Sequence, residues 1–418
     1  MPGFSHKGNM HTILSWGMGV ESTAILVRWL LEPETRPCAL DELLVLTAQT
    51  GDEYEDTGVL CERYILPLLR AERIRFVEVA RCGHLEKEGI VVLADSRSPQ
   101  CMHMDGAYKL SDELRAAGTV PQFGGEHRCS LKFKAFVIET WLRERFQYPA
   151  RHAFGYSLEE PKRVAKSEQA IADRVAFGFS AEELGRADRA ASYDRPNRTG
   201  FYPLIEWGWT RQMCLDYLFS RLGVVWEKSA CVYCPFNQLG ADALRRHKQH
   251  ATQVAEALQL ELVSLTLNPR GTLYKKQSLY EYADQSGNTE AIAAFEEKLA
   301  RQSWRVYRVR RIYGAKKDAN GQILTERKGQ ALRAVEHCSE KIPMQRAKEL
   351  LEQTARTLGS DLEVKRGIPY LYQRRAGNSF PTREEYFVAG PAVVEVKARY
   401  GLEWFEEQWD ARQSSLFT

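Results

Sequence analysis

The chain has 418 residues, which is long for one hydrophobic core, so two or more domains are expected. Apolar residues make up 44% and charged residues 27%, as in globular proteins, and no apolar run is long enough to span a bilayer. The net charge of +3 excludes a chain that is basic throughout, so any affinity for nucleic acid must come from a local cluster. The start, MPGFSHKGNMHT, lacks the apolar core of a secretory signal, and nine cysteines then suit a reducing compartment; we expect a cytoplasmic protein without membrane partners.

The first part of the chain alternates strands with helices. Strands are predicted at 11–15, 41–50 and 74–80, and helices at 23–31 and 55–72. This alternation predicts an α/β fold with a parallel sheet. The turns at 15–23 and 47–56 would lie at the carboxyl ends of the strands, where such sheets bind ligands.

The rest of the chain is expected to be mainly helical. Residues 211–223 form an amphipathic helical pattern that ends at Gly223, and 251–300 also favour helices. Residues 303–314 alternate like a strand, and "DANG" (318–321) favours a turn, so a basic hairpin is predicted at about 303–327. The tail beyond about 340 is charged and helix-prone. We therefore expect one domain over 1–240 and a mainly helical region over 241–418.

The glycine turn "GMGVES" (17–22) allows three phosphate-binding interpretations. The Walker A motif requires a lysine, which the turn lacks. The dinucleotide fingerprint fits at Gly17 and Gly19, but Ser22 takes the third glycine position and the next strand ends without an acid. In the third interpretation, the turn resembles the S-G-G-x-D-S loop of N-type ATP pyrophosphatases. "SWGMGVESTA" (15–24) likewise resembles the S-x-G-G-G-x-x-S-T-A form of the PAPS reductase-like proteins in that PP-loop, or adenine nucleotide alpha hydrolase-like, superfamily.

This resemblance implies a HUP-like (Rossmann-like) nucleotide-binding domain that holds ATP. Free backbone N–H groups at a helix start favour an anion, and nearby hydroxyls add donors. The residues expected to contact the nucleotide here are Ser15, Gly17, Gly19, Glu21, Ser22 and Thr23. The alternative is a turn that caps a helix without any ligand.

A second loop, "TAQTGDEYEDT" (47–57), resembles the D-T-G-x-E segment of the same superfamily. It adds four expected nucleotide-binding residues: Thr50, Gly51, Asp52 and Glu53. Asp52, Glu53 and Glu55 could hold Mg²⁺ against the phosphates, because Mg²⁺ prefers carboxylate oxygens and water. The alternative is a solvated acidic loop that caps the next helix.

Further segments follow in the order of the family. "HRCSLKFK" (127–134) resembles R-x-C-T-x-x-[FY]-K, which implies catalytic roles for Arg128, Cys129 and Lys134. Cations there would stabilise charge as pyrophosphate leaves. Three more segments match family elements: "GYSLEEPKR" (155–163), "YPLIEWGWTRQMCLDYL" (202–218) and "KSACVYCPF" (228–236).

Cys231 and Cys234 form a C-x-x-C pair with several possible uses. With Cys129 they could hold a [4Fe–4S] cluster, as in tRNA-thiolating relatives of the superfamily, and with His247 and His250 they approach the spacing of a Zn²⁺ site. A redox dithiol and a knuckle of buried thiols are the alternatives.

The basic hairpin carries arginines interleaved with aromatic residues. Arg305, Arg308, Arg310 and Arg311 could neutralise phosphates while Trp304, Tyr307 and Tyr313 stack on bases. This pattern predicts a nucleic-acid interface, such as for DNA or tRNA. The alternative is a hairpin whose aromatic residues belong to a core.

Together these motifs predict an ATP-dependent enzyme that adenylates an oxygen of DNA or tRNA and releases pyrophosphate. The resemblance extends to DNA phosphorothioation sulfurtransferases, which implies sulfur transfer and a sulfur-donor protein such as a cysteine desulfurase. A sulfonucleotide (PAPS or APS) reductase is the first alternative, although only Cys338 stands late in the chain. The second is a non-catalytic nucleotide-binding module of a defence complex.

Overall fold

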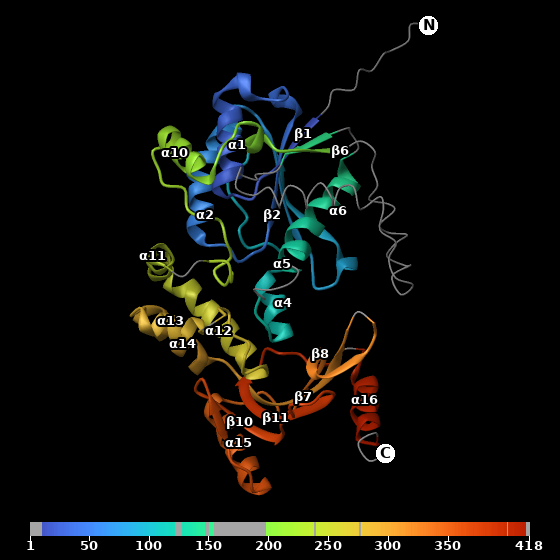
Figure 1. Cartoon of the computed structure of the whole chain (residues 1–418). Coiled ribbons are helices and arrows are strands. Elements are labelled where there is room, and N and C mark those ends of the chain that lie inside the picture. The colour runs from blue at the N-terminus through green and yellow to red at the C-terminus, as the bar shows by residue number, and fades with distance from the viewer. Residues whose placement is uncertain are drawn as a thin grey trace. The chain divides into compact units, whose positions relative to one another are not determined.

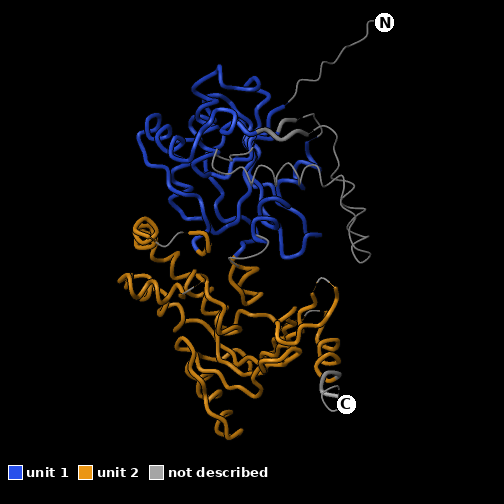
Figure 2. The backbone as a smooth tube through the Cα atoms, in the orientation of Figure 1, with its two compact units in different colours: residues 1–110, 126–232 blue, residues 111–125, 233–418 orange. Residues whose placement is uncertain are grey.

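A computed structural model describes residues 11–121, 128–146, 150–153, 198–237, 240–275, 277–318, 320–398 and 400–414. The chain divides into two compact units, each described by itself below (Figure 2). Unit 1 comprises residues 1–110 and 126–232, and unit 2 comprises 111–125 and 233–418. The segment "GYSLEEPKR" (155–163) lies outside the described residues.

Unit 1 is an α/β unit built on a six-stranded sheet in the order β4-β3-β2-β1-β5-β6. Its strands are β1 (His11–Ser15), β2 (Leu43–Gln49), β3 (Arg75–Arg81), β4 (Ile90–Ser96), β5 (Ala150–Ala153) and β6 (Arg198–Phe201). Its helices are α1 (Val20–Leu31), α2 (Glu55–Leu60), α3 (Leu66–Ala71), α5 (Arg128–Ser130), α6 (Phe136–Arg145), α9 (Pro203–Glu206) and α10 (Arg211–Leu222). All neighbouring strands run parallel except β3 and β4.

The strand and helix pattern predicted for the first part of the chain is confirmed. A π-helical turn, Cys61–Ile65, joins α2 to α3 where one helix was expected, and another, Leu131–Ala135, joins α5 to α6. Helix α1 begins at Val20, three residues earlier than predicted. Helix α10 ends before Gly223 as predicted, because that glycine adopts the left-handed conformation at the C-cap.

Hydrophobic side chains alternate between the two faces of this sheet, as the two-residue period of a strand requires. On β1, Ile13 packs toward Trp141 of α6, whereas Leu14 joins the core that α1 and α10 form on the opposite face (Figure 1). The sheet is therefore covered on both sides, and ligands can reach its strands only at their ends.

The turn after β1 lies at the place where the strand order reverses. Strand β1 stands between β2 and β5, and the chain proceeds outward to β2 and β3 before it returns to β5 and β6. In open parallel sheets this switch point, at the carboxyl ends of the strands, is where ligands bind. The fold thus places the glycine turn at the expected binding edge.

Unit 2 contains a six-stranded antiparallel sheet in the order β12-β8-β7-β11-β10-β9. Its strands are β7 (Trp304–Lys317), β8 (Ile323–His337), β9 (Glu363–Lys365), β10 (Ile368–Arg374), β11 (Thr382–Pro391) and β12 (Lys397–Ala398). Its helices are α4 (Leu110–Ala117), α11 (Ala241–Gln249), α12 (Ala251–Leu267), α13 (Leu279–Gln285), α14 (Thr289–Arg301), α15 (Met344–Leu358) and α16 (Leu402–Ser414).

The C-terminal region contains the expected helices, but it also contains a six-stranded sheet of which the sequence analysis predicted only the hairpin. The hairpin is present as β7 and β8, but four further strands extend it into a sheet that packs against α12 on one face and against α15 and α16 on the other. These strands carry many charged residues, which give the sequence a helix-like composition. On β11, for example, Arg383 donates to the Trp409 carbonyl and Glu384 pairs with Arg311.

Among the described residues, no helix combines the length and apolar character needed to cross a bilayer.

Candidate functional site

The glycine turn is a short link between β1 and α1 that β2 holds in place. The backbone N–H of Trp16 donates to the Leu46 carbonyl at 2.9 Å, and the Thr47 hydroxyl donates to the Trp16 carbonyl at 2.9 Å. Gly19 is the N-cap of α1, in extended conformation, and no side chain caps the helix there. The first N–H groups of α1 are therefore directed to the carboxyl edge of the sheet.

Met18 occupies a position where the resembling family has glycine. Its φ is +59°, in the left-handed region that glycine adopts without strain. The side chain is buried, and the Met18 carbonyl accepts a hydrogen bond from Trp226 Nε1 at 2.9 Å. Packing and this hydrogen bond hold the strained backbone in the shape that a glycine would take.

Gly17 and Gly19 are not required by the fold of the chain. Neither has a positive φ. A Cβ added to Gly17 would meet nothing within 4 Å, and one added to Gly19 would lie at ordinary contact distance, 3.8 Å, from Glu21 and Ser229. Glycines in such surroundings leave room for a ligand to approach the backbone closely. Gly51 differs, because its φ is +81° and an added Cβ would lie 2.7 Å from Lys109 Cγ.

A buried carboxylate connects the second loop to the glycine turn. The Glu53 side chain is 1% exposed and forms an ion pair with Lys134 Nζ at 2.9 Å. Ser229 Oγ lies 2.6 Å from the other Glu53 oxygen and 2.8 Å from the Gly17 carbonyl oxygen. One hydroxyl has a single proton, so Ser229 can donate to only one of these acceptors at a time. The fold thus brings the predicted residues Glu53 and Lys134 together beside the glycine turn. Lys134 belongs to the π-helical segment Leu131–Ala135.

A second ion pair lies at the start of α1. Glu21 pairs with Arg211 of α10, and the Arg211 side chain remains 39% exposed. The carboxylate of Glu21 alone would repel an anion from the helix N-terminus. Arg211 neutralises it and supplies exposed guanidinium donors at the same edge.

Three of the expected hydroxyl contacts are made within the protein. Ser15 Oγ lies 2.6 Å from His152 Nε2 on β5, and Thr23 Oγ1 accepts from Trp16 Nε1 at 2.9 Å. Ser22 Oγ lies 3.4 Å from the Gly19 carbonyl. These hydroxyls, which the sequence predicts to contact the nucleotide, take part in hydrogen bonds that fix the turn.

In the loop after β2, Thr50 is buried and its hydroxyl lies 3.3 Å from Cys231 Sγ. The carbonyl of Asp52 accepts from the Val232 N–H at 3.1 Å, and Glu53 and Cys231 form an isolated β-bridge. Burial, reinforced by the charge of Glu53, raises the pKa of the Cys231 thiol well above its usual value.

The predicted metal or cluster site would draw its ligands from both units: Cys129 and Cys231 belong to unit 1, and Cys234, His247 and His250 belong to unit 2. Among the described residues, no group of three His, Cys, Asp or Glu side chains that could hold a metal ion is found. Cys129, Cys231 and Cys234 are all partly exposed. His247 of the alternative set is buried against Tyr282, with ring centroids 5.8 Å apart, and His250 caps the end of α11. The metal or cluster site stays a prediction.

Ser229, Arg211 and Trp226 are contacts that the sequence reasoning missed. Ser229 lies inside "KSAC" and Arg211 inside "WTRQMC", two segments that were noted only for their resemblance and cysteines. Arg128, another of the predicted catalytic residues, lies on α5 in an exposed position six residues before Lys134.

The arginines of β7, predicted to contact nucleic acid, make hydrogen bonds and ion pairs within unit 2. Arg310 and Arg311 are buried. Arg310 pairs with Glu336 and Glu406, and Arg311 pairs with Glu384. Arg308 pairs with Glu385 at 2.6 Å, and Arg305 donates to the Ser339 carbonyl at 2.8 Å. The aromatic residues Trp304, Tyr307 and Tyr313 are buried, as in the alternative interpretation. Arg308, Arg310 and Arg311 are thus paired with acids of unit 2, whereas Arg305 donates to a backbone carbonyl.

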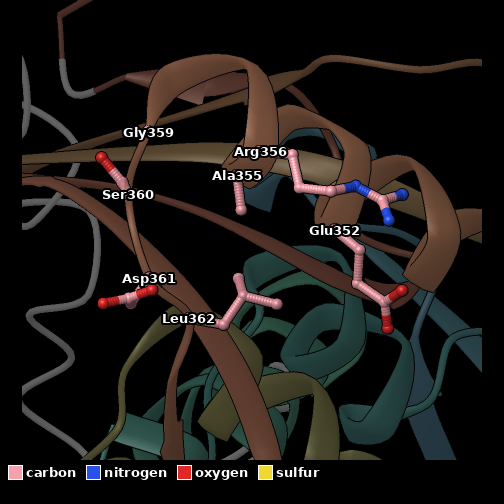
Figure 3. A pocket seen from close by; sticks show the side chains of 7 residues that line it. All are labelled: Glu352, Ala355, Arg356, Gly359, Ser360, Asp361 and Leu362. Carbon is pink, nitrogen blue, oxygen red and sulfur yellow. The ribbon is translucent and has the colours of Figure 1, made fainter.

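A surface hollow of about 410 Å³ lies in unit 2 at the C-terminal end of α15. Figure 3 shows Glu352 and Arg356 of the helix on one side, and Ser360 and Asp361 on the other. None of the site residues predicted from the sequence lines it.

Comparison of the whole chain with protein-family models, with curated proteins and with solved structures finds no match.

Proposed function

We propose that unit 1 binds ATP at the glycine turn and acts as an ATP-dependent adenylating enzyme. The observation that carries this proposal is the pair Gly17 and Gly19, which the fold does not need and a phosphate would. Their place at the switch point of a mostly parallel sheet supports it. So do the two cations, Lys134 and Arg211, that converge on the turn.

The chemistry that suits this arrangement is attack on the α-phosphorus by an oxygen of a nucleic acid, DNA or tRNA, with pyrophosphate as leaving group. Backbone N–H groups of residues 19–23 would bind the phosphates, and Lys134 and Arg211 would stabilise the charge that develops on pyrophosphate. Mg²⁺, when bound, would neutralise phosphate charge, and Asp52 or Glu53 together with phosphate oxygens and water would suffice to hold it.

The resemblance to DNA phosphorothioation sulfurtransferases and tRNA thiolases supports sulfur transfer as the second half of the reaction. Sulfur from a donor protein such as a cysteine desulfurase would displace AMP from the adenylated oxygen.

Release of labelled pyrophosphate from ATP, with duplex DNA or bulk tRNA as acceptor, tests the proposal. Gly19→Ala should fold normally, since its Cβ makes only ordinary contacts, but should weaken ATP binding by about 10-fold or more because the Cβ takes the space of a phosphate.

Gly240→Ala is a matched control, because Gly240 is also an extended helix N-cap with open space around its Cβ. It should leave ATP binding unchanged. Equal ATP affinity of Gly19→Ala and the wild type, or no ATP binding by the wild type, would overturn the proposal.

A further inference from the structure

A cysteine, a histidine and a buried glutamate form a hydrogen-bonded series in unit 1, apart from the residues proposed to bind ATP. Cys101 Sγ lies 3.9 Å from His103 Nε2, within the range of a sulfur hydrogen bond. His103 Nδ1 lies 2.8 Å from Glu78 Oε2. The Cys101 and His103 positions are exposed, whereas the Glu78 side chain is fully buried.

The carboxylate fixes which nitrogen of His103 carries the proton. An ionised carboxylate only accepts hydrogen bonds, so Nδ1 must be the donor toward Glu78. In the neutral ring, Nε2 is then an acceptor, and it faces the thiol of Cys101. This is the arrangement in which a base, oriented by a third group, takes a proton from a nucleophile.

The surroundings hold Glu78 and His103 in this geometry. The Glu78 carboxylate also accepts from Gln49 Nε2 at 2.6 Å and from the backbone N–H of His103 at 3.1 Å. The register of β3 and β4 shifts directly at Glu78, a bulge of the kind often found beside active sites.

The loop that carries Cys101 is anchored on both sides of it. Arg70 donates to the Pro99 carbonyl at 2.8 Å, and the Met102 N–H donates to Glu62 at 2.8 Å. Pro99 and Met102 are buried, so the exposed Cys101 is presented between two fixed points. The thiol and its base are therefore preorganised.

We propose that Cys101 is a nucleophilic thiol that attacks S–S bonds, of a disulfide or a persulfide, with His103 as its base and Glu78 as the residue that positions His103. Attack on divalent sulfur leaves the developing charge on the departing sulfur, and so needs no oxyanion hole. An exposed thiol suits an electrophile that is small or carried by another protein.

The reaction balances without an external oxidant or reductant. The Cys101 thiol gives its proton to His103 Nε2, and the thiolate attacks one sulfur of R–S–S–R′ or the outer sulfur of R–S–SH. The old S–S bond breaks and a new one forms at Cys101. The leaving thiolate takes the proton from His103 and departs as a thiol. Cys101 then carries a mixed disulfide in the first case and a persulfide in the second.

This inference goes beyond the proposed function and does not depend on it, because the thiol reaction requires no ATP. The test is the rate at which each cysteine of the full chain reacts, measured by peptide mass spectrometry at neutral pH. One arm uses oxidised glutathione and the other glutathione persulfide. A mass increase of one glutathione or of one sulfur atom identifies the source that Cys101 uses.

Cys82 provides an internal reference, because it is also exposed and, among the described residues, has no hydrogen bond to a histidine. Cys101 should react about 10-fold faster than Cys82 or more. His103→Gln should bring the two rates together at neutral pH. In alkaline buffer, where thiols ionise without a base, variant and wild type should react alike.

His103 is partly exposed, so His103→Gln should remain folded, and its thermal midpoint checks this. Equal rates of Cys101 and Cys82 in the wild type would overturn the proposal. So would a His103→Gln protein in which Cys101 keeps its faster rate at neutral pH.

Discussion

Glu53 is the residue through which three segments of unit 1 meet. Its carboxylate is removed from water and is compensated by Lys134 at 2.9 Å and by Ser229 at 2.6 Å. A buried charge costs several kcal/mol unless it is paired. The main effect of removing Lys134 would therefore be an uncompensated carboxylate at Glu53, and the net attraction of the pair would matter less.

Lys134→Met should therefore lower the free energy of unfolding of unit 1 by about 1–3 kcal/mol, because it leaves Glu53 without its cation. The cost is below that of a fully buried pair, since the Lys134 side chain is 37% exposed. The double variant Glu53→Gln/Lys134→Met should recover part of the loss. Urea unfolding of the single and double variants measures the coupling.

Lys87→Met, which removes an exposed lysine from the same unit, is the control and should change the stability by less than about 0.5 kcal/mol. Additive effects of the Glu53 and Lys134 substitutions would show that the pair contributes nothing.

At the residue scale, the sequence predicts where the turn lies but not which atoms face a ligand. The glycine spacing and the following helix located the turn correctly. The hydroxyl of Ser15 is bonded to His152, 137 residues away, and Glu21 is paired with Arg211, 190 residues away. Such partners are set by tertiary packing, so no local pattern reveals that these side chains are already engaged.

At the element scale, β7 shows how a strand can be predicted from its sequence while the partners of its side chains cannot. Alternation along 303–314 identified the strand. Tyr307 and Val309 face α12, whereas Arg310 and Ile312 face α16. The acids that neutralise the arginines come from β8, β11 and α16, and the basic pattern of β7 alone could not show them.

Arg310→Met should release α16 from the sheet. Arg310 is 1% exposed, donates to both Glu336 and Glu406, and lies over the rings of Phe405 and Trp409 at 5.4 and 5.3 Å. Its loss leaves two carboxylates facing each other, at a cost of about 2–4 kcal/mol. Amide hydrogen exchange of residues 402–414 should become faster, while that of α12 should stay unchanged.

Arg346→Met on α15 is the control, because its pair with Glu349 is at the surface, with the Arg346 side chain 62% exposed. If α16 keeps its protection in Arg310→Met, the ion pairs do not hold the helix.

At the scale of the whole molecule, the division of the chain is more complicated than one boundary near residue 240. Residues 111–125 belong to unit 2, although the chain on both sides of them belongs to unit 1. Arg115 pairs with Glu256 at 2.9 Å, and Arg333 donates to the Ala117 carbonyl at 2.7 Å. These contacts join segments far apart in sequence, which explains why composition alone suggested a single cut.

ATP is proposed to bind unit 1, whereas the buried His247 lies in unit 2. ATP should therefore change the stability of unit 1, and a fall in pH should change the stability of unit 2. Burial, and to a smaller extent the charge of Arg246, lowers the pKa of His247 to about 4. The unfolded chain takes up this proton near pH 6.5, so the unfolded state binds more protons between pH 6.5 and 4 and stability is lost as the pH falls through that range.

Unit 2 should therefore lose about 2 kcal/mol between pH 7 and 5, a value obtained from the two pKa values by linkage. His247→Phe should abolish this loss with little cost of its own. Among the described residues, the buried His247 Nε2 has no hydrogen-bond partner, and the ring packs edge-on against Tyr282. ATP at 100 times its Kd should stabilise unit 1 alone by about 2.7 kcal/mol. Urea unfolding followed by hydrogen exchange, which reports each unit separately, measures both effects. An acid-induced loss that persists in His247→Phe would assign the titration to another group, and protection of unit 2 by ATP would contradict a nucleotide site confined to unit 1.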